Sequence, residues 1–240
     1  MGQVRGRRWA VTAAGVVLAA VAGLLVIVAV SASSHAQPTV TERCHSITVA
    51  SEKRRAEVAG SGPTVAVIGD SYSQGLGLAD PRLSWPSHLA GTVVVDGFSG
   101  SGFSDAASPC RDEAYYHRIG RALAADPSLV VLQGGLNEYD VPGTQIRQGL
   151  ARALDGLAGQ HVVMVGPPMA PRRAYAVSRV DTLLAKAAAR HGIPYVRTSS
   201  WALTYLPDRL HLTEAGHSAF GDGVADALSA LGQVPALRVS

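Results

Sequence analysis

Short apolar segments alternate with helix-like segments along most of this 240-residue chain. The apolar segments are rich in Val, Ile and Leu, as expected of strands that are buried on both faces of a sheet. They span 64–68, 92–95, 128–133, 161–165 and 193–196, and helix-like segments cover 114–125, 144–158, 174–191 and 213–231. This alternation predicts one α/β domain over residues 63–240, with a parallel sheet that is covered by helices on both faces.

A long apolar run precedes this domain. Residues 9–30 contain a single polar side chain, that of Thr12. The run is long enough to cross a bilayer as one helix, which takes about 20 residues. Three arginines lie in residues 1–8, and the positive-inside rule then places this tail in the cytoplasm. We expect one N-terminal transmembrane helix over 9–30 that anchors an exported domain. A cleaved signal is the alternative, because small residues at 30–32 and 34–36 could form a peptidase site.

Residues 31–62 are mixed and polar, so we expect an exported linker there. Cys44, in this linker, and Cys110 are the only two cysteines. Export to an oxidising compartment favours a Cys44–Cys110 disulfide, and two free thiols are the alternative. Two cysteines without histidines at ligand spacing make a poor zinc site.

The net charge of +3 comes from the N-terminal tail. The chain has 21 basic and 18 acidic side chains, and residues 1–30 contain three arginines and no acid. The rest of the chain therefore has equal numbers of basic and acidic residues. Binding to a phosphate backbone relies on a cationic surface, so we expect no nucleic-acid partner.

Polar and glycine-rich segments follow several predicted strands. Gly69-Asp70-Ser71 follows the first strand, residues 96–102 follow the second, and 134–138 follow the third. The segment 208–211 comes just before the last helix. In open parallel sheets, ligands bind beyond the carboxyl ends of the strands, so these segments are candidates for one site. Gly-Asp-Ser by itself could also be an ordinary loop.

Together the segments contain the groups that acyl transfer requires. Ser71 would attack a carbonyl carbon, His211 would take up and return the proton, and Asp208 would orient the imidazole. The oxyanion of the intermediate needs preorganised donors. We expect these to be the backbone N–H groups of Ser71 and Gly100 and the side-chain amide of Asn137.

In order and spacing, the segments resemble the sequence blocks of the SGNH hydrolases, also called the GDSL esterase/lipase family. GDSYSQG at 69–75 is similar to the nucleophile block, FSG at 98–100 to the glycine block, GLNE at 135–138 to the G-x-N-D block, and DRLHLTEAGH at 208–217 to the D-x-x-H block. The resemblance spans about residues 64–231. It implies a flavodoxin-like three-layer α/β/α fold with a five-stranded parallel sheet, and a serine mechanism without metal or cofactor.

The chain departs from the family pattern at a few positions. Glu138 stands where aspartate is usual, and we expect little effect because this side chain should not contact the reacting atoms. Tyr72 replaces a common aliphatic residue and is expected to narrow or line the pocket. Gly102 is the alternative donor in the glycine block. We expect His217 to pack near the site. We expect Arg172-Arg173 to lie in a solvated loop, and contact with an anionic substrate is the alternative.

These features predict an exported, membrane-anchored serine esterase, or a secreted one if the N-terminal segment is cleaved. We expect hydrolysis of carboxylic esters through an acyl-enzyme on Ser71, with short-acyl or acetyl esters of an envelope glycan or lipid as substrates. One alternative is an O-acyltransferase that passes the same acyl group to a sugar hydroxyl. Another is a catalytically inactive envelope-binding module, against which the intact set of site residues argues.

Overall fold

The computed structural model describes residues 37–233, and the predicted five-stranded parallel sheet lies at its centre. The strands are β1 (Thr64–Gly69), β2 (Thr92–Gly97), β3 (Leu129–Gln133), β4 (Val162–Val165) and β5 (Tyr195–Val196). Their order is β2-β1-β3-β4-β5, and all neighbouring strands are parallel. From β1 the chain goes to β2 on one side and then to β3 on the other. The switch point at which such sheets bind ligands therefore lies between β1 and β3.

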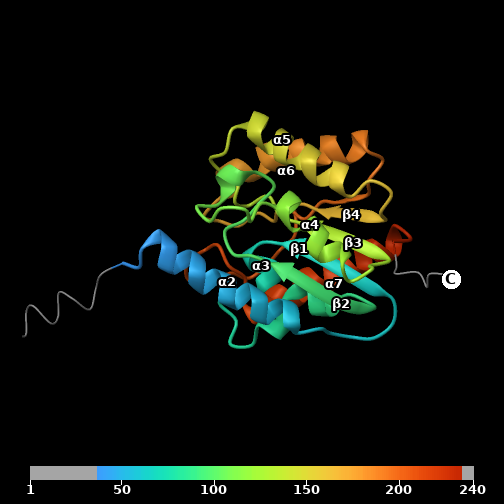
Figure 1. Cartoon of the computed structure of the whole chain (residues 1–240), viewed down its shortest axis with the longest axis horizontal. Helices are drawn as coiled ribbons and strands as arrows, with labels where there is room; N and C mark the ends of the chain where they lie inside the picture. The colour runs from blue at the N-terminus through green and yellow to red at the C-terminus, as the bar shows by residue number, and fades with distance from the viewer. Residues whose placement is uncertain (1–36, 234–240) are drawn as a thin grey trace, which may run out of the picture. The chain divides into compact units, whose positions relative to one another are not determined.

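Helices cover both faces of this sheet, which confirms the three-layer α/β/α prediction. They are α3 (Ser71–Gln74), α4 (Tyr115–Leu123), α5 (Gly143–Gly156), α6 (Ala174–Arg190) and α7 (Glu214–Ala230). Figure 1 shows α5 and α6 on one face and α7 on the other. Successive strand residues point to opposite faces. Accordingly, Val65 and Val67 of β1 pack in the core that contains α7, and Ala66 and Ile68 pack in the core that contains α4, α5 and α6.

The N-terminal boundary of the domain differs from the prediction. We expected a linker over 31–62, but Val40–Ala56 forms helix α2, which packs beside β2. After α2, Ala59 exchanges two backbone hydrogen bonds with Val93 of β2. The linker prediction is therefore wrong for this part of the chain. The physical reason is that α2 has no apolar stripe to reveal it and is held by polar and covalent contacts.

Three contacts hold α2 on the domain. The predicted disulfide joins Cys44 to Cys110, with the two Cα atoms 5.5 Å apart. Arg54 is buried and donates to Ser84 Oγ at 3.3 and 3.4 Å. Arg55 forms an ion pair of 3.4 Å with Asp96, at the end of β2. These contacts make α2 part of the folded domain.

The predicted transmembrane segment over 9–30 lies outside the described residues. Within residues 37–233, no helix is both long and apolar enough to span a bilayer.

We expect loss of the disulfide to lower the free energy of unfolding by about 2–4 kcal/mol, because the cross-link limits the freedom of the unfolded chain. The measurement is the free energy of unfolding in urea, for the Cys44→Ser/Cys110→Ser variant and for the wild-type protein. Alkylation of the folded, unreduced protein should add no mass. Two alkylated thiols in that sample would show that the bond does not form.

Candidate active site

The turn after β1 presents Ser71 at the carboxyl edge of the sheet. Asp70 caps α3, and its Oδ1 accepts a hydrogen bond from the Tyr72 N–H at 2.9 Å. Ser71 is the first residue of α3, so its own N–H has no acceptor within the helix. Gly69 is required here because a Cβ would lie 2.0 Å from Ser73 Oγ. The turn therefore offers both a serine hydroxyl and an unused backbone donor.

Asp208 and His211 form a hydrogen-bonded pair in the loop before α7. His211 Nδ1 lies 2.6 Å from Asp208 Oδ2, and the N–H groups of Leu210 and His211 donate to Oδ1 at 2.9 and 3.0 Å. Partial burial raises the pKa of Asp208, but the hydrogen bonds from His211 and from these N–H groups outweigh it and hold the pKa at about 2. Asp208 is thus an anion at neutral pH. It accepts a hydrogen bond from His211 Nδ1–H, which leaves Nε2 of the imidazole as the nitrogen that can accept a proton.

Tyr72 connects the serine turn to the loop that carries the histidine. Its hydroxyl donates to Leu210 O at 2.6 Å across 138 residues of sequence. Tyr72 follows Ser71 and Leu210 precedes His211, so this one bond brings the two segments together. We expected Tyr72 to narrow or line the pocket. Its side chain is instead buried, with an exposed fraction of 1%.

Asp70 is fully buried beside the serine. Burial raises the pKa of Asp70 to about 6, although the hydrogen bond from the Tyr72 N–H and the positive charge of Arg173 act in the opposite direction. The residue directly before the candidate nucleophile is therefore a buried carboxyl group.

The glycine-rich segment after β2 makes a tight turn at Gly100. The Ser101 N–H donates to Phe98 O at 3.1 Å, and Gly100 has a φ of 80°, which glycine adopts without strain. A Cβ on Gly100 would meet nothing within 4 Å, so this residue borders open space. By contrast, a Cβ on Gly102 would lie 2.0 Å from Glu138 Oε1. The surroundings therefore favour Gly100 over Gly102 as a donor to a ligand.

Asn137 follows β3 and faces the glycine turn. Its Nδ2 donates to Ser101 O at 2.7 Å, and its side chain is almost completely buried. Its Oδ1 accepts a hydrogen bond from Arg173 at 2.6 Å. We expected Arg173 to lie in a solvated loop, but it is part of the site. The sequence did not reveal this because the two residues are 36 positions apart.

Arg118 of α4 is a further residue that the sequence did not single out. Its side chain is fully buried and donates to Asp96 O at 2.7 Å, to Gly69 O at 3.0 Å and to Ser101 Oγ at 2.9 Å. It thus fastens the ends of β1 and β2 to the glycine turn. An arginine within a helix usually indicates an exposed position, so only the three-dimensional contacts identify this one.

Glu138 links the asparagine segment to the glycine segment. Its Oε1 accepts from the N–H groups of Phe103 and Ser104 at 2.6 and 3.4 Å. Burial raises the pKa of Glu138 to about 7, although these two hydrogen bonds act to lower it. Glu138 therefore supports the backbone behind the site.

This carboxyl makes stability depend on pH. The pKa of Glu138 is about 7 in the folded protein, against 4.5 for an ordinary glutamate. The folded state holds the proton more tightly, so the free energy of unfolding should fall as the pH rises from about 4.5 to about 7. Glu138→Gln should remove a part of this fall on the order of 1–3 kcal/mol.

Urea unfolding at pH 4.5 and 7.5 measures the difference between the two proteins. Asp70, whose pKa is also raised, is present in both proteins, so the difference between them reports on Glu138 together with its interaction with Asp70. Glu52→Gln, at an exposed position of α2, is the matched control and should keep the wild-type pH dependence. An unchanged dependence in Glu138→Gln would contradict the assignment.

His217 packs behind the site, as expected. The Trp85 N–H donates to its Nδ1 at 3.4 Å, and its ring lies edge-on to Tyr72, with centroids 6.0 Å apart. Burial lowers the pKa of His217 to about 4, so the imidazole is neutral at pH 7. In the described part of the chain, no group of three His, Cys, Asp or Glu side chains could hold a metal ion.

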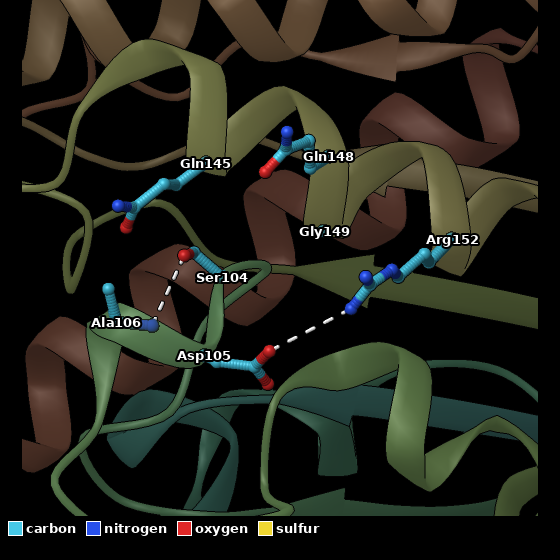
Figure 2. A pocket seen from close by; sticks show the side chains of 7 residues that line it. All are labelled: Ser104, Asp105, Ala106, Gln145, Gln148, Gly149 and Arg152. Carbon is cyan, nitrogen blue, oxygen red and sulfur yellow. Dashed lines mark hydrogen bonds and ion pairs between the residues drawn. The ribbon is translucent and has the colours of Figure 1, made fainter.

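A polar cleft of about 330 Å³ lies between α5 and the short 3₁₀ helix η3 (Asp105–Ala107) (Figure 2). Arg152 of α5 faces Asp105 across it at 3.9 Å, and Ser104 Oγ accepts a hydrogen bond from the Ala106 N–H at 3.2 Å. The cleft contains none of the predicted triad. It is therefore separate from the candidate active site, although Ser104 also contacts Glu138.

Comparisons with solved structures show which proteins share this fold. An aryl esterase from M. smegmatis is 19% identical, with a TM-score of 0.60 over 71% of this chain and 100% of that one. A carbohydrate acetylesterase from Sinorhizobium meliloti is 18% identical, with a TM-score of 0.58 over 70% and 99% of the two chains. A salicylyl-acyltransferase from a tetracycline biosynthetic pathway is 17% identical, with a TM-score of 0.55 over 73% of this chain and 56% of that one. A search of curated proteins found no match.

The sequence also matches a protein-family model. Residues 67–219 match the GDSL-like lipase/acylhydrolase family, and this range includes the serine turn, the glycine turn, Asn137 and the Asp208–His211 pair. The match covers more than half of the chain. The chain therefore belongs to the GDSL-like lipase/acylhydrolase family, the SGNH family of ester-hydrolysing serine enzymes.

Proposed function

We propose that this protein is an exported, membrane-anchored esterase that hydrolyses short-acyl or acetyl esters of an envelope glycan or lipid through an acyl-enzyme on Ser71. The observation that carries the catalytic part is the bond from Tyr72 to Leu210, which joins the serine turn to the loop of the Asp208–His211 pair. The resemblance of the fold to an aryl esterase and a carbohydrate acetylesterase supports small ester substrates.

In the first half of the reaction, Ser71 Oγ attacks the carbonyl carbon of the ester and its proton passes to His211 Nε2. Asp208, ionised at neutral pH, stabilises the imidazolium that forms. The carbonyl oxygen becomes an oxyanion, and the N–H groups of Ser71 and Gly100 and the Asn137 amide donate hydrogen bonds to it. The intermediate collapses, and the alcohol leaves with the proton from His211.

In the second half, a water molecule attacks the acyl group on Ser71. His211 takes one proton from the water, and the same three donors stabilise the second oxyanion. The C–O bond to Ser71 breaks, the proton returns to Ser71 Oγ, and the carboxylic acid is released. No step requires a cofactor.

An O-acyltransferase is the second candidate. The salicylyl-acyltransferase among the similar structures supports it, because a sugar hydroxyl would replace water in the second half of the reaction. A series of p-nitrophenyl esters of increasing acyl length, with and without a monosaccharide acceptor, separates the two. We expect free acid as the main product and the highest kcat/KM for acetyl to butyryl esters. Acylated sugar as the main product would assign the transferase instead.

Two observations support export. Residues 9–30 are long and apolar enough to cross a bilayer, and the Cys44–Cys110 disulfide suits an oxidising compartment. We expect the full-length protein in the membrane fraction, with its domain accessible to protease added outside the cytoplasm. A soluble product that begins near residue 33 or 37 would indicate a cleaved signal, and a soluble full-length protein would contradict the anchor.

A further inference from the structure

Arg173, the residue before α6, binds the segment that carries Asn137. Its backbone N–H donates to Ala170 O at 2.9 Å, which fixes the start of the helix. Its guanidinium Nη1 donates to Leu136 O at 3.0 Å and to Asn137 Oδ1 at 2.6 Å. The guanidinium carbon also lies 4.4 Å from the centroid of the Tyr139 ring, within the range of a cation–π contact. Three contacts therefore define the position of this side chain, and the backbone bond defines the residue that carries it.

These contacts determine which way the Asn137 amide faces. A guanidinium can only donate hydrogen bonds, so the amide atom that faces Arg173 is the oxygen. The amide nitrogen carries two hydrogens, of which one is donated to Ser101 O at 2.7 Å. Within residues 37–233, no acceptor takes the second hydrogen. That N–H is therefore available to an oxyanion bound between Asn137 and Gly100.

We propose that Arg173 is a positioning residue of the oxyanion hole, which holds the Asn137 amide with its free N–H toward the reacting carbonyl and polarises it. A positively charged group that donates a hydrogen bond to the amide oxygen makes the N–H groups of the same amide better donors. The effect is largest when the acceptor bears a full negative charge, so it acts on the transition state more than on the bound ester. This inference depends on the proposed esterase mechanism.

Arg179 of α6 provides a matched control. Its guanidinium donates to Val141 O at 3.1 Å, to Glu138 O at 2.9 Å and to Tyr139 O at 3.1 Å. It thus fastens the same loop through backbone carbonyls only. Arg173 alone of the two contacts the Asn137 side chain. A general loosening of the loop should therefore follow from either substitution, and a defect in the oxyanion hole only from Arg173.

The experiment compares kcat and KM of full-length Arg173→Gln and Arg179→Gln on p-nitrophenyl acetate. Arg173→Gln should lower kcat about 10- to 100-fold with KM within about 3-fold, because the lost contact acts in the transition state. Arg179→Gln should keep kcat within about 3-fold of wild type. In an Asn137→Ala background, Arg173→Gln should add less than about 3-fold, because the residue acts through the amide that is already missing. Guanidinium added to Arg173→Ala should restore part of kcat.

Three results would overturn the inference: wild-type kcat in Arg173→Gln, equal losses in the Arg173 and Arg179 variants, or losses that multiply when Arg173→Gln and Asn137→Ala are combined. If Arg173→Gln does not fold, Arg173→Lys is used, because it keeps the charge but lacks the planar guanidinium. Its kcat should fall below that of wild type by more than the roughly 3-fold limit set for Arg179→Gln, and a wild-type kcat would overturn the inference. The proposed function fails separately, if the wild-type protein does not hydrolyse any ester of the series.

Discussion

Replacing Ser71 with alanine is expected to lower kcat for ester hydrolysis by about 10³- to 10⁶-fold, because no other group can carry the acyl intermediate. The exchange removes one oxygen from a side chain with no hydrogen-bond partner among the described residues. Stability should therefore stay within about 0.5 kcal/mol of wild type. The measurement is kcat on p-nitrophenyl acetate, together with labelling of the purified protein by a fluorophosphonate probe.

The probe gives a second, independent readout. It should label the wild-type protein at Ser71, as located by peptide mass spectrometry, and should not label Ser71→Ala. Ser218→Ala, on α7, is the matched control and should keep both labelling and kcat. Labelling of Ser71→Ala would place the nucleophile elsewhere. A folded wild-type protein that neither reacts with the probe nor hydrolyses esters would favour the inactive envelope-binding module.

The second large effect is expected at His211. His211→Ala should lower kcat by about 10³- to 10⁶-fold, because it removes both the acceptor for the Ser71 proton and the donor for the leaving alcohol. It also leaves Asp208 without its 2.6 Å side-chain partner, so the pKa of Asp208 should rise from about 2 toward its ordinary value.

Added imidazole should restore part of the activity of His211→Ala, since a free base can occupy the space of the lost side chain. His191→Ala, at the exposed end of α6, is the matched control and should be fully active. If His211→Ala loses less than about 10-fold in kcat, another group must act as the base.

Local sequence patterns were sufficient to predict the sheet and most helices. Each of the five strands lies in a short apolar run that is bounded by glycine, proline or polar residues, and all five are present. The predicted helices at 144–158 and 174–191 correspond closely to α5 and α6. Such features depend on neighbouring residues, and the alternation of strands and helices then restricts the topology.

Long-range polar contacts could not be predicted in this way. The cross-link from Cys44 to Cys110 was predicted, but helix α2 lacks an apolar stripe, and its polar contacts through Arg54 and Arg55 were not. The buried guanidinium of Arg118 and the bond from Arg173 to Asn137 join segments that only the fold brings together. A polar residue within a helix or loop has the same local pattern whether it faces solvent or a buried carbonyl. The candidate nucleophile and base could be predicted from the sequence, because each lies in a short sequence block and the blocks follow one another in a fixed order along the chain.

The carboxylate of Asp96 forms ion pairs with three arginines from two helices. Arg118 and Arg121 of α4 bind it at 3.1 and 2.7 Å, and Arg55 of α2 adds a third, longer contact at 3.4 Å. If α2 separates from the domain, Asp96 keeps its two shorter contacts, and Arg118 still holds the glycine turn through Ser101. Durability and catalytic rate are therefore separable in this enzyme. A molecule with a broken cross-link should unfold at a lower urea concentration, yet its kcat should equal that of the intact protein under conditions in which both are folded.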